Sequence, residues 1–485
     1  MKLNYEVYKD KVHACWIGKN IGGTMGTPYE GKRELLDIKG FVTDKNVVLP
    51  NDDLDLQLVW LTAVERCGAA AVNAQLLGEY WIHFVTPHWN EYGIGKANMK
   101  VGIMPPLSGD AFNTWKDSNG AWIRTEIWSC LAPADPDLAA KYAYEDACVD
   151  HGASGEGTVA AVFVAAIESA AFYESDVRRL INIGLSKIPE ESRMYKSIKL
   201  LLECYDNGMD YVSARNAILN ANADIGDGWF EAPSNVSYAM LGLLWGEGDF
   251  KKSMIYAINC GDDTDCTGAT LGSILGIIGG TAGIPTDWRE HIGDTISTIS
   301  INLGSLRSTP QTCTDLTERV AKQAPFMLAA NHSSVSITEG ENEIPENIYE
   351  LTLADNSKTK KLFSRPAYSY TVDFLHTSAT VILPGDPKIL PGETMKIRVR
   401  FENNVPHFQD INPVFIKLRW LLPEGFSVTG EKCLRMPHKN SHYNATIEGE
   451  FEIMAESTES VNRLVLEAVV DGRLTAGYIP IVLFG

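Results

Sequence analysis

The spacing of apolar residues changes once along the chain, near residue 330, and this change limits the folds that the chain can adopt. Before it, small and apolar residues recur at the spacing of an α-helix, as in residues 55–85 and 157–173. After it, apolar and polar residues alternate, as in residues 392–403 and 446–454, in runs rich in β-branched residues. We therefore expect a mainly α chain, in which a large all-helical domain is followed by a C-terminal antiparallel β-sandwich.

The segment 330–347 is polar and has few large apolar residues, and we interpret it as a linker. The helical domain then comprises residues 1–329. Residues 348–485 would form a β-sandwich of about seven strands and immunoglobulin-like size. We expect this sandwich to pack against the helical domain, because no exposed aromatic row is evident in its pattern.

The chain is acidic, with 62 Asp and Glu residues against 42 Lys and Arg residues and a net charge of −20. Such a chain repels phosphate backbones and anionic lipids, so we expect neither a nucleic-acid partner nor a membrane partner. Divalent cations, in contrast, are attracted wherever several carboxylates converge.

Several features predict an unexported, cytoplasmic protein. The N-terminal residues have mixed charges and no apolar core of signal-peptide length. The nine cysteines are scattered and form no C-x-x-C pair, which is typical of reduced thiols. The apolar stretch 268–285 is barely long enough to span a membrane. It has a glycine at every fourth position from Gly268 to Gly280, and we interpret it as a buried core helix that another helix approaches closely.

Two short acidic segments each stand immediately before an apolar helix. They are residues 51–55, Asn-Asp-Asp-Leu-Asp, and residues 262–265, Asp-Asp-Thr-Asp. An aspartate at a helix N-terminus can simply cap the helix, which explains one acid per helix. Several packed carboxylates repel one another, and a bound divalent cation removes that cost. Oxygen ligands without a nearby His or Cys pair favour Mg²⁺, Mn²⁺ or Ca²⁺ over Zn²⁺. Spacing alone leaves the cap and the metal site both open.

Two further segments have residues suited to a binding site. Residues 22–31 are rich in glycine and include Glu30, and the alternative is a packed helix that ends in a Gly-x-Pro turn. Arg124 and Glu126 lie between two tryptophans, and the alternative there is a surface ion pair.

A Gly-rich loop at residues 150–157 contains His151, Gly155 and Glu156 and precedes an Ala-rich helix. Glycine around an acid and a histidine leaves room for a substrate. A plain loop between two helices is the alternative, and the local pattern favours it.

Taken in order, these motifs resemble those of the ADP-ribosylglycohydrolases, which include dinitrogenase-reductase-activating glycohydrolase and the ADP-ribosyl-acceptor hydrolases. The motifs are G-x-x-x-G-x-P-x-E at residues 22–30, N-D-D at residues 51–53, a His-Gly loop at His151, and G-D-D-T-D-C-T-G-A-T-L-G at residues 261–272. The two acidic motifs are fairly specific together and weak singly. The resemblance spans about residues 8–300 and implies an all-α fold with a binuclear Mg²⁺ or Mn²⁺ centre in a cleft.

The resemblance also implies which residues hold the two ions. They are Asn51, Asp52, Asp53, Asp263, Asp265 and Cys266. Asn51 replaces a threonine of the family pattern, and its amide oxygen can still bind a hard cation. Cys266 replaces a threonine as well, and a thiol is a poor Mg²⁺ ligand. Either a water molecule or Thr267 takes its place, or the second ion is more weakly bound or softer.

The implied reaction is the hydrolysis of a glycosidic bond, in which two cations hold vicinal sugar hydroxyls and position a water molecule. The candidate catalytic carboxylates are Glu30, which in relatives lies beside the metals and the scissile bond, then Asp52, and third Glu156. The expected substrate-binding residues are Arg124, Glu126, His151 and Gly155.

Three functions stay open. The first is release of ADP-ribose from a modified protein or a small acceptor. The second is the same chemistry on another N- or O-glycoside, such as a nucleoside or an oligosaccharide. In the third, the helical domain is a catalytically silent scaffold and the sandwich binds a partner; the clustered aspartates argue against this one. The sequence indicates neither the substrate, nor the metal identity, nor the oligomeric state.

Overall fold

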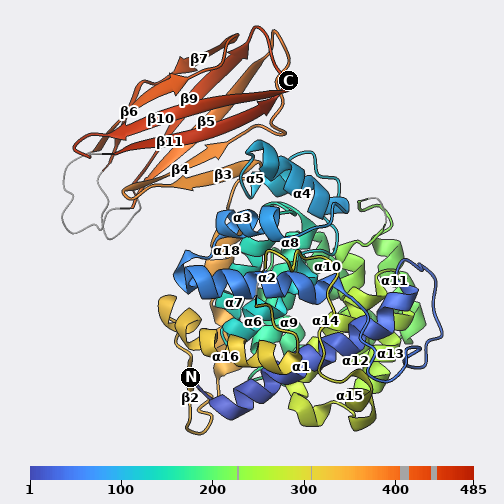
Figure 1. The fold of residues 1–485 in the computed structure, drawn as a ribbon. Coiled ribbons are helices and arrows are strands. Elements are labelled where there is room, and N and C mark those ends of the chain that lie inside the picture. The colour runs from blue at the N-terminus through green and yellow to red at the C-terminus, as the bar shows by residue number, and fades with distance from the viewer. Residues whose placement is uncertain (227–228, 307, 405–413, 438–444, 474) are drawn as a thin grey trace.

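A computed structural model describes the whole chain except residues 227–228, 307, 405–413, 438–444 and 474 (Figure 1). Apart from two three-residue strands, β1 and β2, the regular elements up to Phe363 are helices. From Ser369 onward the described elements are strands. The predicted change from helical to strand structure is therefore confirmed.

The helices belong to one large body, drawn in blue to orange in Figure 1. The α-helices are α1 (Tyr5–Gly26), α2 (Asp52–Cys67), α3 (Ala74–Phe84), α4 (Asn90–Val101), α5 (Leu107–Asp110), α6 (Glu126–Leu131), α7 (Pro136–Ala147), α8 (Glu156–Ala170), α9 (Val177–Ser186), α10 (Arg193–Asp206), α11 (Tyr211–Ala221), α12 (Ala232–Trp245), α13 (Phe250–Asn259), α14 (Thr264–Gly283), α15 (Thr286–Ile292), α16 (Cys313–Ala330), α17 (Ile348–Ala354) and α18 (Ser357–Phe363). Short 3₁₀ helices are η1 (Thr27–Tyr29), η2 (Ala69–Ala71) and η3 (Trp122–Arg124).

Helices α1 and α14 pack antiparallel with their backbones in direct contact. A Cβ atom added to Gly22 would lie 2.0 Å from the carbonyl oxygen of Gly268, an approach that only glycine permits. Further along the pair, Thr264 Oγ1 donates a hydrogen bond of 2.8 Å to the carbonyl oxygen of Gly26. This packing places the first turn of α14 beside the end of α1 and the turn that follows it.

Helix α14 is the one helix, among the described residues, that is long and apolar enough to cross a membrane. Two-thirds of its most apolar stretch is buried inside the protein. Gly268, Gly272 and Gly276 face the backbone of α1. The expectation that residues 268–285 form a buried core helix is therefore confirmed.

The strands from Ser369 onward form two antiparallel sheets, and β1 and β2 form a separate parallel pair. The short strands β1 (Lys2–Asn4) and β2 (Ser336–Thr338) pair with each other; the others are β3 (Ser369–Asp373), β4 (Thr377–Ile382), β5 (Thr394–Asn403), β6 (Val414–Leu421), β7 (Phe426–Gly430), β8 (Cys433–Met436), β9 (Thr446–Ala455), β10 (Val461–Val470) and β11 (Ala476–Phe484). One sheet has the order β3-β4-β5-β9-β7 and the other the order β11-β10-β6-β8. Burial alternates along β5, as it does in a strand with one covered face.

Buried residues of both sheets belong to a single hydrophobic cluster. Val399 of β5 and Ile481 of β11 are members, and so is Leu107 of α5 in the helical part. Nearby, the backbone N–H of Phe112 donates a hydrogen bond of 2.8 Å to Asp386 Oδ1. The sheets are therefore attached to the helical part through a shared apolar cluster.

The first strand of the two sheets begins later in the chain than residue 348, where the sequence placed the start of the sandwich. Residues 348–363, assigned from the sequence to the sandwich, form α17 and α18, and the first strand of the sheets begins at Ser369. Tyr349, Leu353 and Leu362 explain the difference, because they pack against the hydrophobic core of the helical part. The two sheets contain nine strands in the described residues, against the expected seven.

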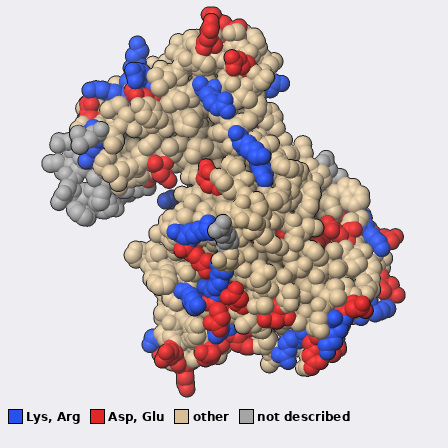
Figure 2. All heavy atoms as spheres, in the orientation of Figure 1, with Lys and Arg blue, Asp and Glu red and all other residues tan. Residues whose placement is uncertain are grey.

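Acidic and basic side chains are interspersed on the face shown in Figure 2, and a hollow lies between the C-terminal sheets and the helices on that face. Residues of α7 and α18 together with Thr371, Thr380 and Arg400 of the sheet line a cavity of about 850 Å³. The two parts of the molecule therefore enclose space between them as well as sharing a cluster.

Candidate metal centre and active site

The first acidic segment lies at the N-terminus of α2. Oδ1 of Asn51 accepts a hydrogen bond of 2.7 Å from the backbone N–H of Asp53, so Asn51 caps the helix. Asp52 is half-buried, and its Oδ2 accepts a hydrogen bond of 3.1 Å from the Tyr92 hydroxyl. Asp53 is fully buried, and neither of its carboxylate oxygens has a hydrogen-bond partner among the described residues.

The second acidic segment lies at the N-terminus of α14, with Asp263 in the N-cap position. Nδ2 of Asn119 donates a hydrogen bond of 2.6 Å to Asp263 Oδ2, and the backbone N–H of Asp263 donates one of 3.2 Å to Asn235 Oδ1. Asp263 and Asp265 are both buried. Within the part of the chain that the structure describes, Oδ1 of each lacks a hydrogen-bond partner.

The structure brings the two segments together. Ligand atoms of Asp53, Asp265 and Cys266 all lie within 4.8 Å of one another, and so do those of Glu30, Asp263 and Asp265. Asp265 belongs to both groups, so the groups adjoin. Glu30 reaches this place because η1 follows α1, and the backbone N–H of the next residue, Gly31, bonds to the Asp262 carbonyl oxygen at 2.8 Å.

Crowding and burial raise the pKa values of these carboxyl groups. Burial is the main cause for Asp263, whose pKa rises to about 8, and the charge of Glu30 adds to it. Burial and the charge of Asp263 raise the pKa of Asp265 well above its usual range. Burial also raises that of Asp53, although the charge of Lys19 opposes the shift. We call Glu30, Asp52, Asp53, Asp263 and Asp265 the acidic cluster. Near neutral pH, this cluster is therefore stabilised by protons or by a cation.

A pocket of about 90 Å³ lies beside the cluster. Its lining includes Glu30, Asp52, Trp89, Glu91, Tyr92, Ser118, Asn119, Asp263, Asp265 and Cys266. Glu30 is exposed, while the other acids of the cluster are half-buried or buried. Partial burial and the charge of Asp52 raise the pKa of Glu30, which suits a group that exchanges a proton near neutral pH.

Sequence analysis did not find three polar residues of this pocket, which are Glu91, Tyr92 and Asn119. Glu91 is 6% exposed, and its Oε2 has no hydrogen-bond partner among the residues that the structure describes. Burial raises its pKa, and the charge of His151 opposes this rise. Glu91 and Tyr92 are neighbours and Asn119 lies in another segment, and neither segment has an acidic or glycine-rich motif that would distinguish these residues.

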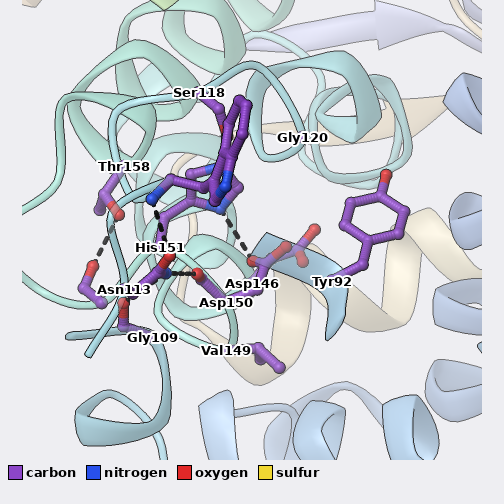
Figure 3. A network of polar contacts seen from close by, with 12 residues as sticks. Tyr92, Gly109, Asn113, Ser118, Gly120, Asp146, Val149, Asp150, His151 and Thr158 are labelled. Atoms are coloured by element: carbon purple, nitrogen blue, oxygen red, sulfur yellow. Dashed lines mark hydrogen bonds and ion pairs between the residues drawn. The ribbon is translucent and has the colours of Figure 1, made fainter. Parts of the chain in front are cut away.

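His151 lies in a buried polar network next to the pocket (Figure 3). Its Nδ1 is 2.9 Å from Asp150 Oδ1, and its Nε2 is 3.3 Å from Ser118 Oγ. Arg124 donates a hydrogen bond of 2.7 Å to the same oxygen of Asp150. Ser118 lines the pocket, whereas His151 is fully buried behind it. The histidine therefore contacts the wall of the pocket through Ser118 and does not line the opening.

Arg124 and Glu126 are fully buried and bind partners in the protein interior. Nε of Arg124 lies 2.9 Å from Asp146 Oδ1, and Glu126 Oε1 lies 2.7 Å from Lys19 Nζ. Both side chains are therefore occupied by partners in the interior, and their expected contact with substrate stays a prediction. The physical reason is charge pairing, because a buried charge persists only beside an opposite one.

Glu156 caps a different helix. Its Oε1 accepts a hydrogen bond of 2.8 Å from the backbone N–H of Arg193, and its Oε2 accepts one of 2.9 Å from that of Met194, at the start of α10. Glu156 does not line the acidic pocket, and its expected role as a base stays a prediction from the sequence. Gly155 is needed for packing instead, since a Cβ atom there would lie 2.2 Å from the Lys116 carbonyl oxygen.

The residues of the cluster fit a divalent cation. Four buried carboxylate oxygens, on Asp53, Asp263 and Asp265, have no hydrogen-bond partner in the described parts of the chain, and such oxygens are ligands for hard cations. The hydroxyl of Thr267 donates a hydrogen bond of 2.6 Å to the Asp263 carbonyl oxygen, and Thr267 does not line the pocket, whereas Cys266 does.

Comparison with known proteins connects this geometry to a family. A family profile described as ADP-ribosylglycohydrolase matches residues 4–324, a range that contains both acidic segments. A solved ADP-ribosylglycohydrolase-related protein complex has 17% sequence identity and a TM-score of 0.44, over 66% of this chain and 99% of that chain. A conjugative transposon lipoprotein from Bacteroides eggerthii has 12% identity and a TM-score of 0.17, over 23% of this chain and 98% of that chain. A search of curated proteins found no match.

Proposed function

Because the chain belongs to the ADP-ribosylglycohydrolase family, we propose that it is a metal-dependent hydrolase that releases ADP-ribose from a modified protein or a small acceptor. The observation that carries this proposal is the convergence of two acidic segments, distant in sequence, on one pocket. Asn51 caps α2, whereas Asp263 makes no capping hydrogen bond at α14 among the described residues, so helix capping leaves the buried carboxylates unexplained.

We propose that the pocket holds two divalent ions, Mg²⁺ or Mn²⁺. Their ligands would come from Glu30, Asn51, Asp52, Asp53, Asp263, Asp265 and Cys266. Bound ions of this kind orient sugar hydroxyls and lower the pKa of a water molecule. Asn119 and Asn235 hold Asp263 in the orientation that this role needs.

Glu30 is our candidate for the general base. It is the exposed acid of the cluster, and its raised pKa lets it take a proton from water and return it near neutral pH. Asp52 is the second candidate, and the Tyr92 hydroxyl holds its carboxylate in place. Glu91 lines the same pocket, and its carboxyl group with raised pKa is suited to protonating the leaving group.

The test is incubation of the full chain with ADP-ribosylated protein, ADP-ribosyl-arginine, nucleosides and oligosaccharides in Mg²⁺ or Mn²⁺. We expect free ADP-ribose from the first two substrates, and a loss of about 100-fold or more in Asp52→Asn. Release of sugar only from nucleosides or oligosaccharides would identify the alternative substrate class on the same site. Absence of release from every substrate, together with no metal binding, would support the silent scaffold.

Thermal melting measures metal binding independently of turnover. Mg²⁺ or Mn²⁺ should raise the unfolding midpoint by mass action, and Asp263→Asn should abolish the rise. The matched control is Asp249→Asn. Asp249 is also an N-cap aspartate, but it is exposed and its side chain accepts a hydrogen bond of 2.8 Å from the backbone N–H of Lys252. It should leave the metal-dependent rise unchanged.

Three other expectations form part of this proposal. The two antiparallel sheets would pack as a β-sandwich of immunoglobulin-like size, and this domain would follow a catalytic domain at residues 1–329. The acidic net charge supports a small glycoside or a modified acceptor as the partner, rather than nucleic acid or membrane. The cytoplasmic location stays a prediction from the sequence.

A further inference from the structure

We propose that Asp53, Asp265 and Cys266, here called the inner site, bind a thiophilic divalent ion of the Zn²⁺ class. Glu30, Asp263 and Asp265, here called the outer site, take a hard ion such as Mg²⁺ or Mn²⁺. The inference rests on the proposed function only in treating the pocket as a metal centre. It replaces two equivalent hard ions with two unlike ones.

The donor atoms of the inner site lie close enough together to share one ion. The ligand atoms of the inner site, two carboxylate oxygens and the Cys266 sulfur, lie within 4.8 Å of one another. Zinc binds oxygen at about 2.0–2.2 Å and sulfur at about 2.3 Å in a tetrahedral arrangement, so its ligand atoms lie about 3.5 Å from one another. Small side-chain rotations therefore bring all three atoms to a common ion.

The inner site contains buried carboxylate oxygens that have no hydrogen-bond partner among the described residues. Asp53 is fully buried, and both of its carboxylate oxygens lack a hydrogen-bond partner in the described chain. Asp265 is 5% exposed and Cys266 is 6% exposed, and Asp265 Oδ1 is likewise without a partner among those residues. Buried carboxylates without partners are costly, and an ion shared by these groups removes the cost.

The chemistry of the donor atoms favours different ions at the two sites. Thiolate ligands select Zn²⁺ and similar soft or borderline ions, whereas carboxylate oxygens suit Mg²⁺ and Mn²⁺. The hydroxyl of Thr267, the residue that follows Cys266, is hydrogen-bonded to the Asp263 carbonyl oxygen at 2.6 Å and does not line the pocket. The inner site therefore offers sulfur, and the outer site offers oxygen alone.

Charge balance also favours an ion at the inner site. Lys19 lies near Asp53, but its ammonium group already pairs with Glu126 at 2.7 Å and donates to the Ile123 carbonyl oxygen at 2.7 Å. The lysine is thus committed to Glu126 and does not neutralise both inner carboxylates. When the ion binds, the Cys266 thiol loses its proton to solvent and the sulfur–metal bond forms, without any change of oxidation state.

The test uses the full chain, reduced and stripped of metal with a chelator. Cys67 and Cys433 are exposed, so Cys67→Ser and Cys433→Ser are made first to remove adventitious thiol ligands. Co²⁺ and Cd²⁺ are then titrated without oxygen, and the thiolate-to-metal charge-transfer absorption is recorded. We expect one equivalent of ion to develop this absorption. Cys266→Thr should abolish the absorption and weaken Cd²⁺ binding by more than about tenfold.

The matched control is Cys260→Thr. Cys260 is also buried and lies six positions earlier, but its thiol donates to the Tyr256 carbonyl oxygen at 3.3 Å. This variant should keep the absorption. Cys266→Ser tests whether loss of absorption reflects loss of sulfur or loss of fold, because both Cys266 variants should melt near the parent midpoint in chelator.

Binding of Mn²⁺, followed by electron paramagnetic resonance, separates this inference from the proposed function. We expect Cys266→Thr to retain Mn²⁺ at the outer site and Glu30→Gln to weaken it. Charge-transfer absorption that persists in Cys266→Thr overturns the inner-site assignment. Mn²⁺ binding without any thiolate absorption in the parent also overturns it, while leaving the proposed function intact. Failure of both ions to bind would reject the two together.

Discussion

Asp263 combines three roles that conflict when the cluster holds no cation. It stands at the N-cap of α14, it accepts a hydrogen bond from Asn119, and it faces Asp265 and Glu30. The first two roles stabilise its ionised form, whereas burial and the neighbouring acids oppose it. The net result is a carboxyl group with a pKa of about 8, which makes the stability of the metal-free protein depend on pH.

We expect the metal-free protein to lose stability as the pH rises from about 5 to about 8. A carboxyl group whose pKa is higher in the folded than in the unfolded protein binds more protons when folded. Its contribution is therefore fully present at low pH and is lost as the pH rises through the folded pKa, which is about 8 for Asp263. The free energy of unfolding in chelator, measured by denaturant titration at several pH values, checks this.

Mg²⁺ or Mn²⁺ should reduce the fall in the free energy of unfolding with rising pH, because the cation replaces the protons. Asp263→Asn should make the fall shallower, whereas Asp249→Asn should leave it unchanged, since Asp249 is exposed. An equally steep fall in Asp263→Asn would show that other groups cause the pH dependence.

Among the elements, the α1–α14 pair decides where the two acidic segments meet. The glycines of the pair let the backbones touch, and this contact positions the first turn of α14 beside the turn that carries Glu30. The regular glycine spacing in α14 was visible in the sequence, and it correctly indicated close approach of another helix. It did not indicate which helix. The residues of α17 and α18 carried a weaker signal, because each helix spans only seven residues.

Gly22→Ala should destabilise the protein by about 1–3 kcal/mol, because its Cβ atom would lie 2.0 Å from the Gly268 carbonyl oxygen and would force the helices apart. Metal affinity should fall with it, since the same contact sets the position of Asp265. Denaturant unfolding and metal titration of the folded fraction give the two quantities.

Gly279→Ala is the matched control in the same helix pair. A Cβ atom at Gly279 meets nothing within 4 Å among the described residues, and alanine favours a helix by up to about 1 kcal/mol over glycine. This variant should be as stable as the parent or more stable. If both variants lost the same stability, the close contact at Gly22 would not be the cause.

On the scale of the whole molecule, the sheets are joined to the helical part through apolar residues in and beside α5, which are Ile103, Leu107 and Ala111. Leu107 is 2% exposed and lies in the cluster that holds both sheets. The ring of Phe112 meets that of Phe484 edge to face, with centroids 5.4 Å apart. This join lies at the start of the loop that leads to Ser118 and Asn119, which line the pocket.

Leu107→Ala should destabilise the protein by about 2–5 kcal/mol, because it leaves a cavity where the sheets meet α5. Hydrogen exchange followed by mass spectrometry should show faster exchange in residues 369–403 and around Leu107. The control is Leu375→Ala, at a position that is 84% exposed, which should change stability by less than about 0.5 kcal/mol. Unchanged exchange in the sheets of Leu107→Ala would mean that they do not depend on this join.

The sequence by itself determined the local structure and the chemical type of the site. Hydrophobic period is a property of neighbouring residues, so it predicted helices, strands and their order. The acidic segments 51–55 and 262–265 could be recognised because several carboxylates in a row before an apolar helix exceed what capping requires. Cys266 could also be identified as the unusual donor.

The tertiary structure alone decided which residues face the pocket. Glu91, Tyr92 and Asn119 come from segments without a motif, and packing brings them to the acids. Packing also turned Arg124 toward Asp146 and Glu156 toward the start of α10, although both stand in promising motifs. A charged side chain takes the partner that the whole fold places within reach, and that partner is set by contacts between residues far apart in the chain.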